Sequence, residues 1–74
     1  MGIFTQTKPD MVHNTVVNWR KTAGLTQAEL AEAAGVTRQT IISLEKGNYV
    51  PSVLLAIKIA NFFETNVEDL FSYE

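Results

Sequence analysis

The chain has 74 residues, of which 46% are hydrophobic, carries a formal net charge of −2 and contains no cysteine. This length suits one small domain with a modest core, and the lack of cysteine excludes disulfides and thiolate metal sites. No apolar run is long enough to cross a membrane and no signal peptide is visible, so we expect a cytoplasmic protein.

The first part of the chain carries little signal for regular structure. Residues 1–10 show no helical or strand period, so we expect a flexible tail there, with local packing of Gly2-Ile3-Phe4 as the alternative. Residues 11–13 are compatible with a short strand. The folded domain is therefore expected to cover residues 11–74.

A first helix is predicted over residues 15–23, with Asn14 as its cap. Its inward face is an apolar stripe at the helical period, made of Val16, Trp19 and Ala23. Arg20 projects onto the same side, where a charge is costly unless it is paired. The alternative is an Arg20 side chain that extends past Trp19 into solvent.

The second predicted helix, Gln27–Ala34, has clear signals at both ends. Thr26 and Glu29 have the spacing of a capping box, in which each side chain accepts a hydrogen bond from the other residue's backbone amide. Gly35 can adopt the left-handed conformation that ends a helix. The inward face consists of apolar, mostly small residues that let another helix cross closely, namely Leu30, Ala31 and Ala34.

A third helix is predicted over residues 38–46, with Thr37 as its cap and Gly47 after its end. Projection at about 100° per residue places Ile41 and Leu44 on the inward side. The opposite side carries Gln39, Ile42, Ser43 and Lys46, with Arg38 at its flank. Two short helices joined by a glycine-containing turn make a helix-turn-helix, which presents its second helix to the major groove of DNA.

The fourth predicted helix, residues 53–64 with Ser52 as its cap, is unusually apolar. Its apolar arc is wider than one core contact requires, so part of it is expected to meet a second surface, most simply another copy of the chain. A last helical turn, Val67–Leu70, and a short strand, Phe71–Tyr73, follow. We expect a two-fold dimer contact that includes Phe62, Val67, Leu70 and Phe71. The alternative is that these residues only close the monomer core.

The run LTQAELAEAAGVTRQTIISLEKGNYVPS has its caps, glycines and Glu-Lys-Gly ending in register, and it resembles the Cro and lambda-repressor type of helix-turn-helix regulators. Within that family the likeness is to very small bacterial members such as the cytolysin repressor, and it covers about residues 11–73. The resemblance implies an all-α, five-helix lambda-repressor-like DNA-binding domain, in which residues 11–13 pair with Phe71–Tyr73 as a two-stranded antiparallel sheet. It also implies an internal ion pair between Arg20 and Glu45.

Together these features predict a sequence-specific DNA-binding transcriptional regulator, a repressor that binds a palindromic operator as a homodimer. Base contacts are assigned to the outward side of the third helix, namely Arg38, Gln39, Thr40, Ile42 and Ser43. Phosphate contacts are assigned to residues around that side, namely Gln27, Thr37, Lys46, Asn48 and Tyr49. The alternative for any single one of them is a solvated surface residue. The negative net charge predicts a shallow salt dependence, because few basic residues are available to contact phosphates.

Other classes of function have less support in the sequence. No catalytic set, phosphate-binding loop or metal-ligand spacing is visible, and His13 is the single histidine, so we expect no enzyme, no cofactor and no metal site. The rival function is a DNA-binding antitoxin of a toxin-antitoxin operon, a role that domains of the same family fill. That function would add a small protein partner.

Overall fold

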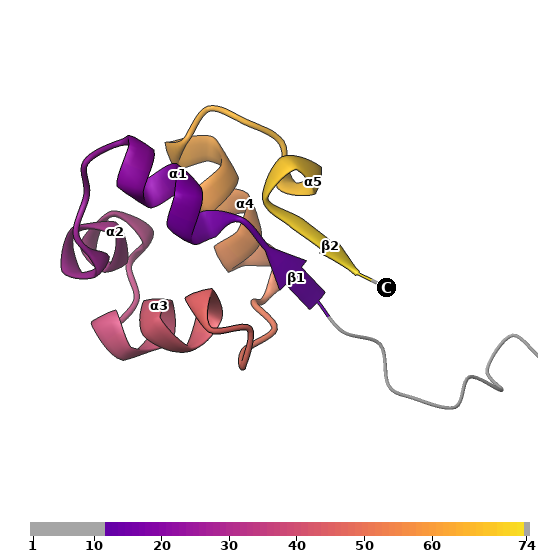
Figure 1. Cartoon of the computed structure of the whole chain (residues 1–74), viewed down its shortest axis with the longest axis horizontal. Coiled ribbons are helices and arrows are strands. Elements are labelled where there is room, and N and C mark those ends of the chain that lie inside the picture. Colours follow the sequence, from indigo (N-terminus) through magenta and orange to yellow (C-terminus); the bar gives the residue numbers. More distant parts are fainter. Residues whose placement is uncertain (1–11, 74) are drawn as a thin grey trace, which may run out of the picture.

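The computed structural model describes residues 12–73, which form five helices and one two-stranded sheet (Figure 1). The elements in chain order are β1 (Val12–Asn14), α1 (Val16–Thr22), α2 (Gln27–Ala34), α3 (Arg38–Glu45), α4 (Val53–Phe62), α5 (Val67–Leu70) and β2 (Phe71–Tyr73). The predicted five-helix fold with a small terminal sheet is therefore confirmed. The expectations for the tail of residues 1–10 and for Gly2-Ile3-Phe4 lie outside the described residues.

Local side-chain hydrogen bonds set the start of α2, as predicted. The Thr26 hydroxyl accepts a hydrogen bond from the Glu29 amide at 3.1 Å, and the Glu29 carboxylate accepts one from the Thr26 amide at 2.8 Å. The helix ends at Gly35, whose φ of 71° is left-handed and therefore strained for any residue with a Cβ. Thr37 and Ser52 cap α3 and α4 in the same way, by accepting from the amides of Thr40 and Leu55.

The structure differs from the sequence-based prediction at the first helix. The capping position before α1 is occupied by Thr15 rather than Asn14, because Asn14 is the last residue of β1. The side-chain oxygen of Asn14, Oδ1, still accepts a hydrogen bond from the Val16 amide at 3.1 Å. At the other end, α1 stops at Thr22, so Ala23 is exposed instead of facing the core.

The fourth helix is shorter than predicted, since it ends at Phe62 rather than at residue 64. Glu64 has a left-handed φ of 56°, and the Thr65 amide donates to the Ala60 carbonyl at 2.9 Å. This hydrogen bond closes the helix end in the manner of a Schellman turn. The third helix likewise ends one residue earlier than predicted, at Glu45.

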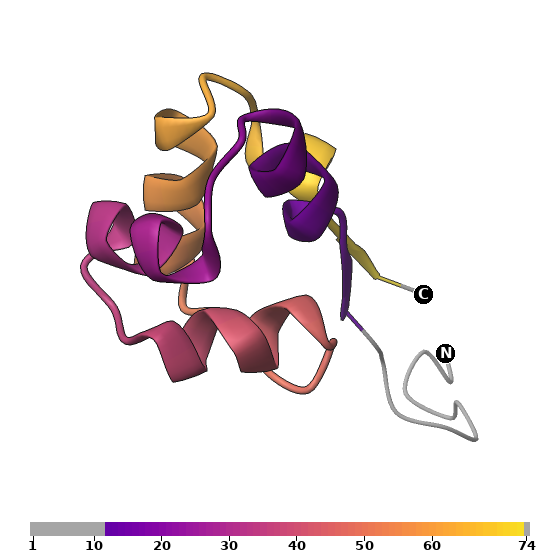
Figure 2. The ribbon, with the colours of Figure 1, turned by 60° about the vertical axis from the view of Figure 1, so that its left-hand side comes forward.

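The core lies where all five helices meet (Figure 2). Its largest fully buried side chains are Val16, Leu30, Ile41, Leu44, Ile59 and Leu70. The expectation that Leu70 contributes to a dimer contact is therefore wrong, because its side chain is 1% exposed and fills the inside of the monomer. α5 has a single turn, so burying Leu70 is what attaches this short helix to the rest of the molecule.

The two strands are antiparallel, with Val12 opposite Tyr73 and Asn14 opposite Phe71. This is the pairing that the family resemblance implied, shifted by one residue at β1. The next residue, Thr15, continues the connection through its amide, which donates to the Leu70 carbonyl at 2.9 Å. The beginning and the end of the described chain thus hold each other beside α3 and α4 (Figure 1). None of the described helices has the length and hydropathy that crossing a membrane would require.

Candidate nucleic-acid interface

One face of α3 is buried in the core and the other is open to solvent. Ile41 and Leu44 are both 0% exposed, which anchors the helix against the rest of the domain. On the opposite side Arg38 and Gln39 are exposed, at the N-terminal end of the helix. The three remaining residues assigned to base contact are half-buried, namely Thr40, Ile42 and Ser43. None of the five residues that the sequence analysis assigned to base contact is part of the buried core, and Arg38 and Gln39 are the most open to solvent.

Hydrogen bonds between side chains order this outward face. Gln39 Nε2 donates to Ser43 Oγ at 3.3 Å, one helical turn further along. The hydroxyl groups of Thr37 and Thr40 share a hydrogen bond at 3.0 Å, while the Thr37 hydroxyl also accepts from the Thr40 amide. These groups are polar, hydrogen-bonding and able to reach either bases or phosphates.

The residues assigned to phosphate contact surround this face. Thr37 precedes α3, and three exposed residues follow it, namely Lys46, Asn48 and Tyr49. At this end of α3 a polar hollow of about 320 Å³ is lined by Lys46 and Asn48 together with His13 and Asn14 of β1. Gln27 is placed differently, because its side-chain amide donates to Glu45 Oε1 at 3.0 Å and is half-buried. Its side chain therefore takes part in holding α3 as well as lying at the start of α2.

An ion pair attaches α1 to the end of α3, as the family resemblance implied. Arg20 Nε donates to Glu45 Oε2 at 2.7 Å and Arg20 Nη2 donates to Glu45 Oε1 at 3.1 Å, so the contact is bidentate. The two side chains are only 11% and 6% exposed. Arg20 Nη1 also donates to the Leu25 carbonyl at 2.8 Å, in the turn before α2. The first three helices are thus connected through one buried carboxylate and one guanidinium.

The pKa values of this pair follow from its surroundings. The hydrogen bond to Glu45 raises the pKa of Arg20 above its ordinary value, against the opposing effect of burial. For Glu45, burial alone would raise the pKa, but hydrogen bonds from Arg20 and Gln27 and the positive charges of Arg20 and Lys21 outweigh it. The pKa of Glu45 is therefore lowered, and both groups stay charged at neutral pH.

One further residue that positions α3 was not recognised from the sequence. Asn14 Nδ2 donates to the Leu44 carbonyl at 2.8 Å, across 30 positions of sequence. An asparagine before a helix is a normal capping signal, so nothing in the sequence distinguishes this long-range role. Through Asn14 the terminal sheet is fixed to the C-terminal turn of α3.

The chemistry of the described residues suits binding rather than catalysis. A solvent-facing helix side carries Arg, Gln, Thr and Ser, which offer the donors and acceptors that match base edges. Within residues 12–73 no group of three or more His, Asp or Glu side chains is placed to hold a metal ion.

A family model described as "Helix-turn-helix" matches residues 17–70, which include both helices of this arrangement. The chain belongs to the helix-turn-helix family of transcriptional regulators. This family acts by binding DNA and is not enzymatic.

Relatives of similar length show the same family. An uncharacterized HTH-type transcriptional regulator of Methanocaldococcus jannaschii is 52% identical over 61 residues, which cover 82% of this chain and 92% of the relative. The HTH-type regulator YgzD of Bacillus subtilis is 49% identical over 61 residues, with the same coverage of both chains. These findings support the Cro and lambda-repressor type of regulator without a particular link to the cytolysin repressor.

A solved structure agrees with the fold of this HTH regulator. The restriction-modification controller protein C.AhdI from Aeromonas hydrophila superposes with a TM-score of 0.68 at 24% identity, over 73% of this chain and 82% of that protein. At this identity the likeness shows the fold alone. The lambda-repressor-like architecture predicted from the sequence is confirmed.

Breaking the ion pair should destabilise the HTH regulator. The substitution Arg20→Ala should lower the free energy of unfolding in urea by about 3 kcal/mol, because it leaves the Glu45 carboxylate buried without its partner. Arg38→Ala removes an exposed arginine at the start of α3, so it is the control and should change the free energy of unfolding by less than about 0.5 kcal/mol. Equal and small effects of the two substitutions would show that the pair does not hold α3.

The lowered pKa of Glu45 predicts a pH dependence of stability. The unfolded chain binds a proton at this group near the ordinary glutamate pKa of about 4.3, whereas the folded chain binds it only at lower pH. The contribution of Glu45 to the free energy of unfolding is therefore complete above about pH 4.3. It is lost as the pH falls through the lower pKa that Glu45 has in the folded chain.

The measurement compares thermal unfolding of the wild type and Glu45→Gln at a series of pH values. The pKa of Asp69 is also lowered, by hydrogen bonds from the Thr65 hydroxyl and the Asn66 amide, but this effect is common to both proteins and cancels in their difference. The stability advantage of the wild type should shrink in acid. Parallel curves down to about pH 3 would contradict the assignment.

Proposed function

We propose that this HTH regulator is a repressor that binds a palindromic operator as a homodimer, with α3 in the major groove of each half-site. The observation that carries the proposal is the division of α3 into two sides. Ile41 and Leu44 fix one side in the core, while Gln39 and Arg38 stand exposed on the other. A helix held in this way can enter a groove as a rigid unit.

The outward side chains suit direct readout of bases. An arginine pairs best with guanine and a glutamine with adenine, so Arg38 and Gln39 read two neighbouring base pairs in this proposal. Ser43 and Thr40 lie next along the helix and reach bases or phosphates. Ile42 is half-buried and adds an apolar contact for a thymine methyl group.

Phosphate contacts in this proposal come from both ends of the helix-turn-helix. Thr37 lies at the start of α3, and the exposed residues Lys46, Asn48 and Tyr49 lie at its end. Gln27 contributes from the first turn of α2, where backbone amides lack partners within the helix. Because most of these groups are neutral, the affinity should depend on salt less steeply than that of a strongly basic protein.

In this proposal the two-fold symmetry of the operator requires a two-fold symmetric protein dimer. A palindromic operator repeats its half-site about 34 Å along the duplex, one turn of B-DNA, so two copies of α3 must be presented at that spacing. Of the residues predicted for the pairing surface, Val67 and Phe71 are half-buried and Phe62 is 43% exposed, so all three retain some surface for a partner.

The direct test is footprinting of the purified protein on the DNA upstream of its own gene. The proposal expects protection of a sequence with two-fold symmetry, with two protected half-sites about one helical turn apart. A well-folded chain that protects no such site, and binds this DNA no better than random DNA, would contradict it.

Point substitutions separate base readout from phosphate contact. Gln39→Ala should cost roughly 1 to 3 kcal/mol on the operator and should relax the sequence preference at one base pair. Lys46→Ala should weaken binding to all sequences about equally and flatten the dependence of affinity on salt. The measurements are binding titrations on operator, single-base variants and random DNA at several salt concentrations.

Lys58→Ala is the matched control for Lys46→Ala, since Lys58 is also an exposed lysine but lies on α4, outside the outward side of α3. It should leave both the affinity and the salt slope nearly unchanged. If Gln39→Ala lowered the affinity for operator and for random DNA equally, Gln39 would not contact a base.

A further inference from the structure

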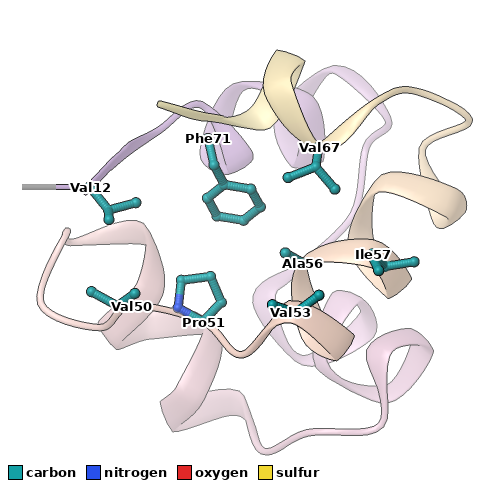
Figure 3. A pocket seen from close by; sticks show the side chains of 8 residues that line it. All are labelled: Val12, Val50, Pro51, Val53, Ala56, Ile57, Val67 and Phe71. Carbon is teal, nitrogen blue, oxygen red and sulfur yellow. The ribbon is translucent and has the colours of Figure 1, made fainter. Parts of the chain in front are cut away.

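An apolar groove runs between α4 and the end of the molecule that carries β1, β2 and α5. Its volume is about 210 Å³. Figure 3 shows Val12, Phe71 and Val67 along one side of it and Val50 and Val53 along the other. Ile57 lies further along the same side of α4. We call this surface the α4 groove.

The α4 groove is apolar throughout and partly open. All of its lining side chains are hydrophobic or proline, so it offers no group that would bind a phosphate or another charged ligand. Val50 and Val53 are 69% and 76% exposed, and Ile57 is 43% exposed. Leu54, the residue after Val53 on α4, does not line the groove but is also 63% exposed. These side chains leave on the order of several hundred Å² of apolar surface together, which is the size of the largest apolar patch on a typical monomer and is often a site of interaction.

We propose that the α4 groove is the surface on which a second copy of this chain docks. The inference rests on the proposed function, because it identifies the pairing surface of the operator-binding dimer. In a two-fold pair the same surface must fit itself. The α4 groove meets this requirement, since two of its own lining side chains, Val50 and Val53, are also its most exposed apolar groups. These side chains of each copy can therefore enter the groove of the other.

The position of the groove relative to α3 favours a second copy over another partner. Val50 and Pro51 line the groove and follow directly after Asn48 and Tyr49, which we assign to phosphate contact. Two-fold docking here brings the corresponding loop of each copy close to the symmetry axis. In the proposed pair the C-terminal end of each α3, which directly precedes this loop, therefore lies near the axis. If an unrelated protein bound in the groove, the position of the groove next to the loop after α3 would have no explanation.

This surface includes only part of the expected dimer contact. Val67 and Phe71 line the α4 groove, but Phe62 does not. The Phe62 ring instead lies against Phe63, with ring centroids 5.1 Å apart in an edge-to-face arrangement. Phe62 and Ile57 are both 43% exposed on α4 and lie on different sides of it, so they form a matched pair for an experiment.

The test compares the wild type, Ile57→Glu and Phe62→Glu by sedimentation velocity at micromolar concentration without DNA. A charge in the α4 groove should abolish docking, so Ile57→Glu should sediment as a monomer while the wild type and Phe62→Glu sediment as dimers. Val53→Lys, at a more exposed position, should also be monomeric, and thermal unfolding should show that each variant is folded. The affinity of Ile57→Glu for the full operator should fall by about 100-fold, because two half-sites are no longer bound together.

Several results would overturn the inference. One is that Ile57→Glu or Val53→Lys is folded and remains a dimer. Another is that Phe62→Glu becomes monomeric while Ile57→Glu does not. A third is that the wild type is monomeric and binds the full operator no more tightly than a half-site. The proposed function fails separately, if the wild type binds no operator. A dimer that is lost in Ile57→Glu but binds no DNA would support the α4 groove and overturn the repressor function.

Discussion

The buried contact between Arg20 and Glu45 is the constraint on which the rest of this structure depends. α3 has eight residues, and a helix of that length is not stable on its own in water. Its inward side is held by Ile41 and Leu44, and the directional hydrogen bonds of the ion pair add a constraint on its position relative to α1. This ion pair is bidentate and involves the last residue of the helix, so it fixes both distance and orientation there. The orientation of the exposed side of α3, which we propose contacts DNA, is thereby set by a contact at the end of the helix.

The same contact explains how an acidic chain can serve as a DNA-binding protein. The sequence has six Lys and Arg residues against eight Asp and Glu, and Arg20 is occupied inside the domain. Glu45 lies at the end of the recognition helix, where a free carboxylate would repel phosphate, but its charge is matched by Arg20 and it is almost fully covered. In the proposed complex, electrostatic attraction is therefore left to a few exposed side chains, and hydroxyl, amide and backbone groups carry a larger share of the contact with DNA.

Local signals predicted the helix-turn-helix well and the tertiary contacts poorly. The bounds of α2 followed from a capping box and a glycine, because both act within a few residues. The periodicity of α3 likewise predicted its buried side. Asn14 and Leu70 were misjudged because their surroundings come from distant parts of the chain. Asn14 reaches the Leu44 carbonyl, and Leu70 is covered by the core rather than by a partner. The ion pair followed only from the family resemblance, since many acids in the sequence could face Arg20.

The terminal sheet has a practical consequence for protein engineering. Val12 and Tyr73 are cross-strand neighbours, so the polypeptide enters and leaves the domain at one spot, with adjacent strands about 5 Å apart. Because the two strand ends are adjacent, a domain with this layout can be inserted into a surface loop of a host protein without distorting the loop or the domain. Reporters joined directly before Val12 and directly after Tyr73 would emerge side by side, which suits proximity-based fluorescence sensors.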